Sequence, residues 1–107
     1  MATQTPTAKA LSERLNKILN AGANFIEQDL QARLQALRPK DIDALNPPSV
    51  MAAGGIWIND AGFCRRLGAW LFDVSDETVE ELSARDYQIF QATVAANFTR
   101  YMELGTP

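Results

Sequence analysis

Residues 83–102 read SARDYQIFQATVAANFTRYM, and their pattern is that of a long amphipathic helix. Phe90, Val94 and Phe98 recur at four-residue steps, which places their side chains on one face of a helix. A stripe of this kind is stable only when it packs against other apolar groups. The stretch therefore predicts a last helix over residues 84–102 whose apolar face packs against the core.

Polar residues that cap helices mark where the preceding elements begin. A serine, threonine, aspartate or asparagine at this position accepts a hydrogen bond from an otherwise unpaired backbone N–H of the first turn. Such a residue followed three positions later by an acidic one is a stronger start signal. The predicted caps are Asn24 (with Glu27), Asn59 or Asp60, Ser75, and Ser83 (with Asp86).

Residues 7–37 are strongly helical in pattern, and Gly22 is a plausible stop within them. Periodicity alone leaves open whether they form one helix or two, and we favour two. The apolar positions assigned to the first are Leu11, Leu15, Ile18 and Leu19, and those assigned to the second are Phe25, Ile26, Leu30, Leu34 and Leu37.

The middle of the chain is more broken. Pro39 ends the preceding helix and starts a short helical turn that reaches Leu45. Residues 56–58, which follow two glycines, are typical of a short extended piece. A helix then carries Phe63, Leu67, Trp70 and Leu71, and a short acidic helix follows Ser75. We therefore predict a mainly α fold, a single small domain of five or six short helices spanning residues 1–107, with frayed termini at residues 1–6 and 103–107.

Composition narrows the class of partner. The chain has 107 residues, of which 47% are hydrophobic and 21% charged, and a net charge of -3. Residues 1–58 hold six Lys/Arg and five Asp/Glu, whereas residues 59–107 hold four and eight. Binding of nucleic acid normally needs clustered cations, so nucleic acid is an unlikely main partner. The acidic second half would favour a basic partner segment.

The chain also carries few signs of export or of membrane insertion. A single cysteine excludes an internal disulfide and fits a reducing compartment. The N-terminus lacks the basic start and apolar run of a signal peptide. The longest nearly uncharged stretch, residues 44–59, is interrupted by two prolines and two glycines. We expect a cytoplasmic protein with no membrane partner.

Groups that commonly support catalysis are scarce. The chain has no histidine, which removes the commonest general base and zinc ligand. Cys64 lies within an amphipathic pattern that favours a small core residue over a nucleophile. Asp73 and Asp76 lack the glycine and distal glutamate of a calcium loop. We therefore predict no catalytic, metal-binding or cofactor-binding residues, and no enzyme.

Aromatic residues offer a better functional signal. Eight of the nine lie after residue 56, more than one short helix pair needs, although most must be core in so small a domain. Trp57 and Tyr101, at the edges of predicted elements, are the candidate protein-binding residues. The leucine stripe of residues 7–37 is a second candidate surface, which packs inside the chain or pairs with another copy or a partner helix.

Five runs within residues 37–102 share a pattern with a known family, namely Leu37–Ile42, Ile56–Asp60, Cys64–Leu67, Val74–Leu82 and Ser83–Phe98. A Leu-x-x-x-Asp-Tyr step, from Leu82 to Tyr87, precedes a final amphipathic helix. In these features residues 37–102 resemble the small tail assembly chaperones of long-tailed bacteriophages. The helical residues 7–37 depart from the extended segment with which such proteins often begin.

The resemblance implies a non-catalytic phage or prophage protein in the cytoplasm of a bacterial host. Such a protein binds the tape-measure protein, keeps its apolar helices from aggregating and helps bring tail-tube subunits to it. Two alternatives stay open, a homodimeric helical interaction module and a small DNA-binding regulator.

Overall fold

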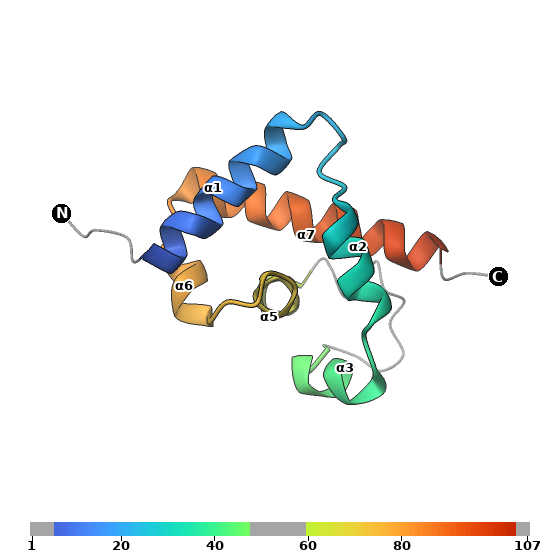
Figure 1. Ribbon diagram of the computed structural model, residues 1–107. Coiled ribbons are helices and arrows are strands. Elements are labelled where there is room, and N and C mark those ends of the chain that lie inside the picture. Colours follow the sequence, from blue (N-terminus) through green and yellow to red (C-terminus); the bar gives the residue numbers. More distant parts are fainter. Residues whose placement is uncertain (1–5, 48–59, 105–107) are drawn as a thin grey trace.

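Helix α7 lies at the centre of the computed structural model, which describes residues 6–47 and 60–104. Helices α1, α2 and α5 all pack against it. Figure 1 shows α7 running across the molecule from α6 towards the C-terminus, with α1 crossing it and α5 seen end-on. The predicted mainly α fold of five or six helices is confirmed, and the described residues contain no strand. The helices are α1 (Pro6–Asn20), α2 (Gln28–Gln35), α3 (Pro39–Leu45), α5 (Ala61–Phe72), α6 (Asp76–Glu80) and α7 (Ala84–Leu104).

The apolar stripe of α7 forms the middle of the core, as predicted. Phe90 and Val94 are fully buried and Phe98 is nearly so. The ring of Phe98 meets that of Phe63 on α5 edge to face, with centroids 5.9 Å apart. Aromatic pairs in this arrangement add to the stability gained from burial alone. The long helix is therefore held by packing along most of its length.

Three of the predicted caps are present. Each accepts a backbone hydrogen bond in the first turn of its helix, which satisfies an N–H that the helix itself leaves unpaired. The pairs are Asp60 with the N–H of Phe63 (2.8 Å), Ser75 with that of Thr78 (3.2 Å) and Ser83 with that of Asp86 (3.1 Å).

The start of the second helix was predicted wrongly. Residues 7–37 do form two helices, but α2 begins at Gln28, with Glu27 and not Asn24 as its N-cap. Asn24 (φ 54°) and Phe25 (φ 70°) adopt left-handed backbone conformations in the connection, so Phe25 and Ile26 precede the helix. Asn97 on α7 binds the backbone on both sides of this turn. A tertiary contact thus overrides the local capping signal.

Smaller differences occur at helix ends. Pro6 is helical and α7 continues to Leu104, so residues 6, 103 and 104 belong to helices and not to frayed termini. Leu19, assigned to the buried face of the first helix, is 36% exposed. It lies one residue beyond the buried Ile18, and α1 ends directly after it. The predicted extended piece at residues 56–58 lies outside the described residues.

Candidate protein-binding surface

Of the two residues chosen from the sequence, Tyr101 can be placed and Trp57 lies outside the described residues. Tyr101 is on the last turns of α7, where its half-buried ring packs against the core. The ring centroid lies 6.1 Å from that of Phe98, one turn earlier. Tyr101 therefore stands where the buried stripe of α7 reaches the surface.

An apolar cavity opens beside Tyr101, between α3, α5 and α7. Its volume is about 240 Å³. Ligand pockets for small molecules usually occupy about 300–1,000 Å³. A cavity below that range suits a single apolar side chain better than a cofactor. The described residues that line it are Leu37, Ile42, Leu45, Phe63, Leu67, Phe98, Tyr101 and Met102.

The depth of burial differs between the base and the edge of this α3–α5–α7 cavity. Phe63, Leu67 and Phe98 are buried and form its base. Tyr101 is half-buried, and Met102 is 38% exposed at its edge. Methionine is unbranched and adapts its shape to different apolar neighbours. The arrangement offers a firm apolar base beneath an adaptable rim.

Helix α3 supplies one wall because α5 holds it in place. The side chain of Arg66 donates from Nε to the carbonyl of Leu45 (2.6 Å) and from Nη2 to that of Asn46 (2.9 Å). These carbonyls lie at the C-terminal end of α3, which carries partial negative charge. At the other end, the Asp41 carboxylate accepts from the N–H of Arg38 at 3.0 Å. Both ends of a seven-residue helix are thus fixed.

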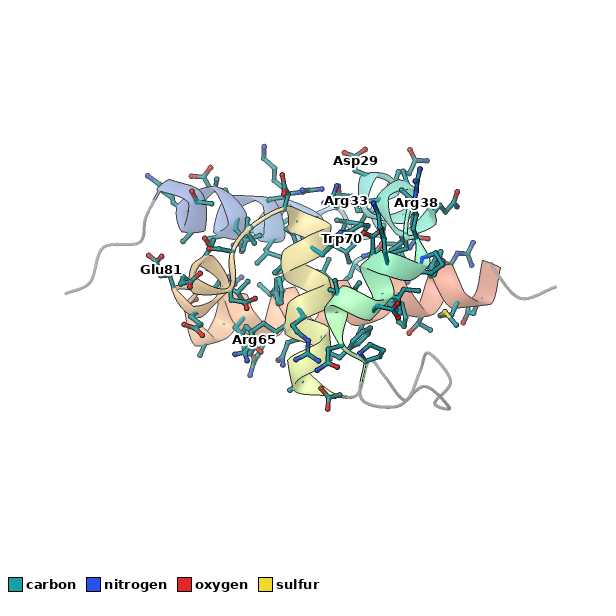
Figure 2. The ribbon with its side chains drawn as sticks, turned by 90° about the horizontal axis from the view of Figure 1, so that it is seen from below. Asp29, Arg33, Arg38, Arg65, Trp70 and Glu81 are labelled. Carbon is teal, nitrogen blue, oxygen red and sulfur yellow. The ribbon has the colours of Figure 1, made fainter. Side chains whose placement is uncertain are left out.

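Several arginines are engaged within the molecule. Arg33 on α2 donates to the carbonyl of Trp70 (2.8 Å), and its guanidinium carbon lies 4.4 Å from the centroid of the Trp70 ring. Figure 2 labels both side chains, which lie next to each other in that view. Arg14 pairs with Glu27 at 2.7 Å and lies over the ring of Phe72. Like Arg66, these guanidinium groups join helices. They are therefore poorly placed to form the row of free cations that a DNA backbone attracts.

Cys64 lies on α5 inside the core. Burial raises the pKa of its thiol to about 11. The thiolate, and not the thiol, is the nucleophilic form, so very little of the reactive form exists at neutral pH. Within residues 6–47 and 60–104, no three histidine, cysteine, aspartate or glutamate side chains come together to hold a metal ion. None of the helices described is long and apolar enough to cross a membrane.

Most of the residues that line the cavity were not predicted from the sequence as binding residues. Ile42 and Leu45 recur at three residues in a segment predicted to be helical, which was a usable signal for an apolar face. Leu37 and Met102 gave no separate signal, because each continued a stripe assigned to the core. They line the cavity because α3, α5 and α7 meet beside them, which is a tertiary feature.

Comparison with protein-family models, with curated protein sequences and with solved structures found no match for this chain. Function therefore has to be inferred from the chain's own residues and their arrangement.

Proposed function

We propose that this protein is a non-catalytic binding protein that binds an apolar helix of a partner protein by taking one of its side chains into the α3–α5–α7 cavity. In this proposal it acts as a tail assembly chaperone does, with the tape-measure protein as client and tail-tube protein as a further partner. The observation that carries the proposal is the almost entirely apolar character of the cavity walls, with Tyr101 and Met102 at the edge. The resemblance of residues 37–102 to that family supports the choice of client.

The free energy gained by burying one side chain in the cavity suits reversible binding. Complete burial of one leucine, phenylalanine or methionine side chain contributes about 1.5–3 kcal/mol. One cavity therefore provides a factor of about ten to a hundred in affinity. An anchor of that strength competes with self-association of an apolar client helix and still releases it. Release is required when the tail tube polymerises around the client.

The proposal predicts how binding responds to salt. Salt screens exposed charges but leaves the burial of apolar area almost unchanged. Co-purification with the tape-measure protein should therefore persist from low to high salt. A DNA-binding regulator behaves in the opposite way, losing affinity steeply as salt rises.

The experiment is co-expression with the product of a very long neighbouring gene, followed by co-purification at low and high salt. A gel shift on the upstream DNA runs beside it, and sedimentation of the protein alone measures its oligomeric state. We expect the client to stay soluble and to co-purify at both salt concentrations. An insoluble client together with a salt-sensitive DNA shift would favour the regulator, and a stable dimer that ignores the client would favour the homodimeric module.

A further inference from the structure

A second groove lies at the other end of α7, between α5, α6 and the first turn of α7. Its volume is about 390 Å³. Val79 and Leu82 are buried beneath it, and the half-buried Tyr87 forms one side, with its ring stacked on Phe90. The described residues that line it are Arg65, Val79, Glu80, Leu82, Ala84 and Tyr87.

One side of this α5–α6–α7 groove is acidic. Helix α6 and its C-cap carry exposed carboxylates at residues 76, 77, 80 and 81, and Glu80 among them lines the groove itself. Arg65 lies on the α5 side, and Figure 2 shows it apart from Glu81, the residue that follows α6. Arg85 is directed towards α1, because it donates to the side chain of Asn16 at 2.9 Å and pairs with Asp86 at 3.3 Å. The α6 rim is therefore the acidic one.

We propose that the α5–α6–α7 groove is a docking site for a partner segment that combines one apolar side chain with neighbouring lysine or arginine residues. The apolar side chain enters between Val79, Leu82 and Tyr87, and the cations face Glu80 and the acidic α6. Charge complementarity selects this occupant over a second copy of the chain. A second copy carries a net charge of -3 and would bring its own acidic α6.

The groove is independent of the α3–α5–α7 cavity. Tyr87 and Tyr101 are fourteen residues apart on one continuous helix, which corresponds to about 21 Å at 1.5 Å per residue. A ligand of the groove does not have to touch the cavity. The inference therefore does not rest on the proposed function, and either can fail alone.

The test uses a synthetic amphipathic helical peptide with a leucine face and a lysine face. Two matched peptides replace the lysines with glutamates or the leucines with serines. Backbone amide shifts of the full-length protein report where each peptide binds. We expect the leucine–lysine peptide to shift residues 79–87 and to bind at least about tenfold more tightly than either control, since several exposed ion pairs each add a small increment.

Two charge-reversal variants should change the affinity for the leucine–lysine peptide in opposite directions. Glu80→Lys should weaken binding of the leucine–lysine peptide about three- to tenfold, whereas Arg65→Glu should strengthen it. The matched control is Asp29→Lys, which makes the same charge change at an exposed position on α2 and should leave the affinity within about twofold. Circular dichroism verifies that every variant is folded.

Three results would overturn the inference. The first is a set of shifts centred outside residues 79–87. The second is equal weakening by Glu80→Lys and Asp29→Lys, since only the net charge of the protein would then matter. The third is a shift of residues 79–87 with protein concentration alone, which would assign the groove to a second copy of the chain.

Discussion

The side chain of Asn97 joins α7 to the connection between α1 and α2. It is fully buried and donates to the carbonyls of Phe25 and Thr93, each at 2.8 Å. Its oxygen accepts from the N–H of Glu27 and from Nε2 of Gln31, each at 3.1 Å. An amide side chain has two donors and one oxygen that accepts twice, so its capacity is filled. One residue thus specifies the path of a turn more than 65 positions away.

Replacing Asn97 with alanine should therefore destabilise the protein more than the same replacement of an exposed neighbour would. The carbonyl of Phe25 and the N–H of Glu27 lose their partner, and each buried unsatisfied group costs about 1–3 kcal/mol. We expect a loss of about 2–4 kcal/mol in urea unfolding. Thr99→Ala, at an exposed position two residues later, is the control and should change stability by less than about 0.5 kcal/mol. Equal stability of the two variants would show that the network contributes nothing.

The buried thiol of Cys64 predicts a pH dependence. Its pKa is raised to about 11 in the folded protein, whereas an unfolded cysteine titrates near ~8.5. A raised folded pKa gives stability that is fully present below the unfolded value and is lost as pH rises through about 11. The stability advantage of the natural protein over Cys64→Ala should therefore shrink by on the order of 3 kcal/mol between pH 8 and 11. Parallel pH curves for the two proteins would contradict this.

At the scale of elements, α5 and α7 cross at Gly68. A Cβ placed on Gly68 would lie 2.1 Å from the ring of Phe90, which is fully buried. Glycine is therefore required here by the close approach of two helices, although alanine is the better helix former by about 1 kcal/mol. The distance between α5 and α7 at this crossing determines how deeply the apolar face of α7 enters the core.

Gly68→Ala should consequently destabilise the protein by about 1–3 kcal/mol or more, as overpacking does. Gly62→Ala in the first turn of the same helix is the matched control, because a Cβ there would lie 3.0 Å from Arg66 and 3.2 Å from Asp60, so that a shift of a few tenths of an ångström makes room for it. We expect thermal denaturation to separate the two variants clearly. A double variant with Phe90→Leu should recover part of the loss, and strict additivity of the two changes would argue against the contact.

Phe90→Ala tests the stripe itself. Removing a fully buried phenylalanine side chain costs about 3–5 kcal/mol, a large share of the stability of a small domain. Gln88→Ala, exposed two residues earlier, should be close to neutral. An unchanged melting temperature for Phe90→Ala would mean that the stripe does not face the core.

Capping residues predicted the start of a helix correctly where that start depends only on neighbouring residues in the sequence. Asp60, Ser75 and Ser83 cap the helices that they were predicted to cap. The prediction at Asn24 was wrong because Asn97, far away in the chain, binds the backbone beside it. The apolar periodicity was enough to predict that a second helix exists. The residue at which it starts depends on a tertiary hydrogen bond, which no local pattern in the sequence contains.

At the scale of the whole molecule, α7 connects two candidate surfaces of different chemistry. The α3–α5–α7 cavity is apolar, and the α5–α6–α7 groove combines apolar and acidic groups. A client helix with apolar and basic stretches would be able to use both. Figure 1 shows α6 and α3, which border the groove and the cavity respectively, on opposite sides of α5.

The candidate site was only partly predictable from the sequence, because it too depends on contacts between residues far apart in the chain. Tyr101 was selected because it lies at the end of an aromatic stripe, and it does line the cavity. The cavity exists, however, because α3 is held beside α5 by Arg66, which reaches back to the carbonyl of Leu45. A sequence pattern gives the apolar face of each helix but not the gap left where three faces meet.

The most direct test of the proposed function measures how tightly the proposed client, the tape-measure protein, binds a variant at the rim of the cavity. Met102→Glu places a charge at the edge of the α3–α5–α7 cavity, where docking of an apolar side chain would have to desolvate it. Ala32→Glu adds the same charge at an exposed position of α2 and is the control.

With both variants shown to be folded, titration calorimetry should find that Met102→Glu weakens binding of the client by about tenfold or more. Ala32→Glu should stay within about twofold of the natural protein. Equal affinities for the two variants would contradict the assignment of the cavity as the protein-binding site.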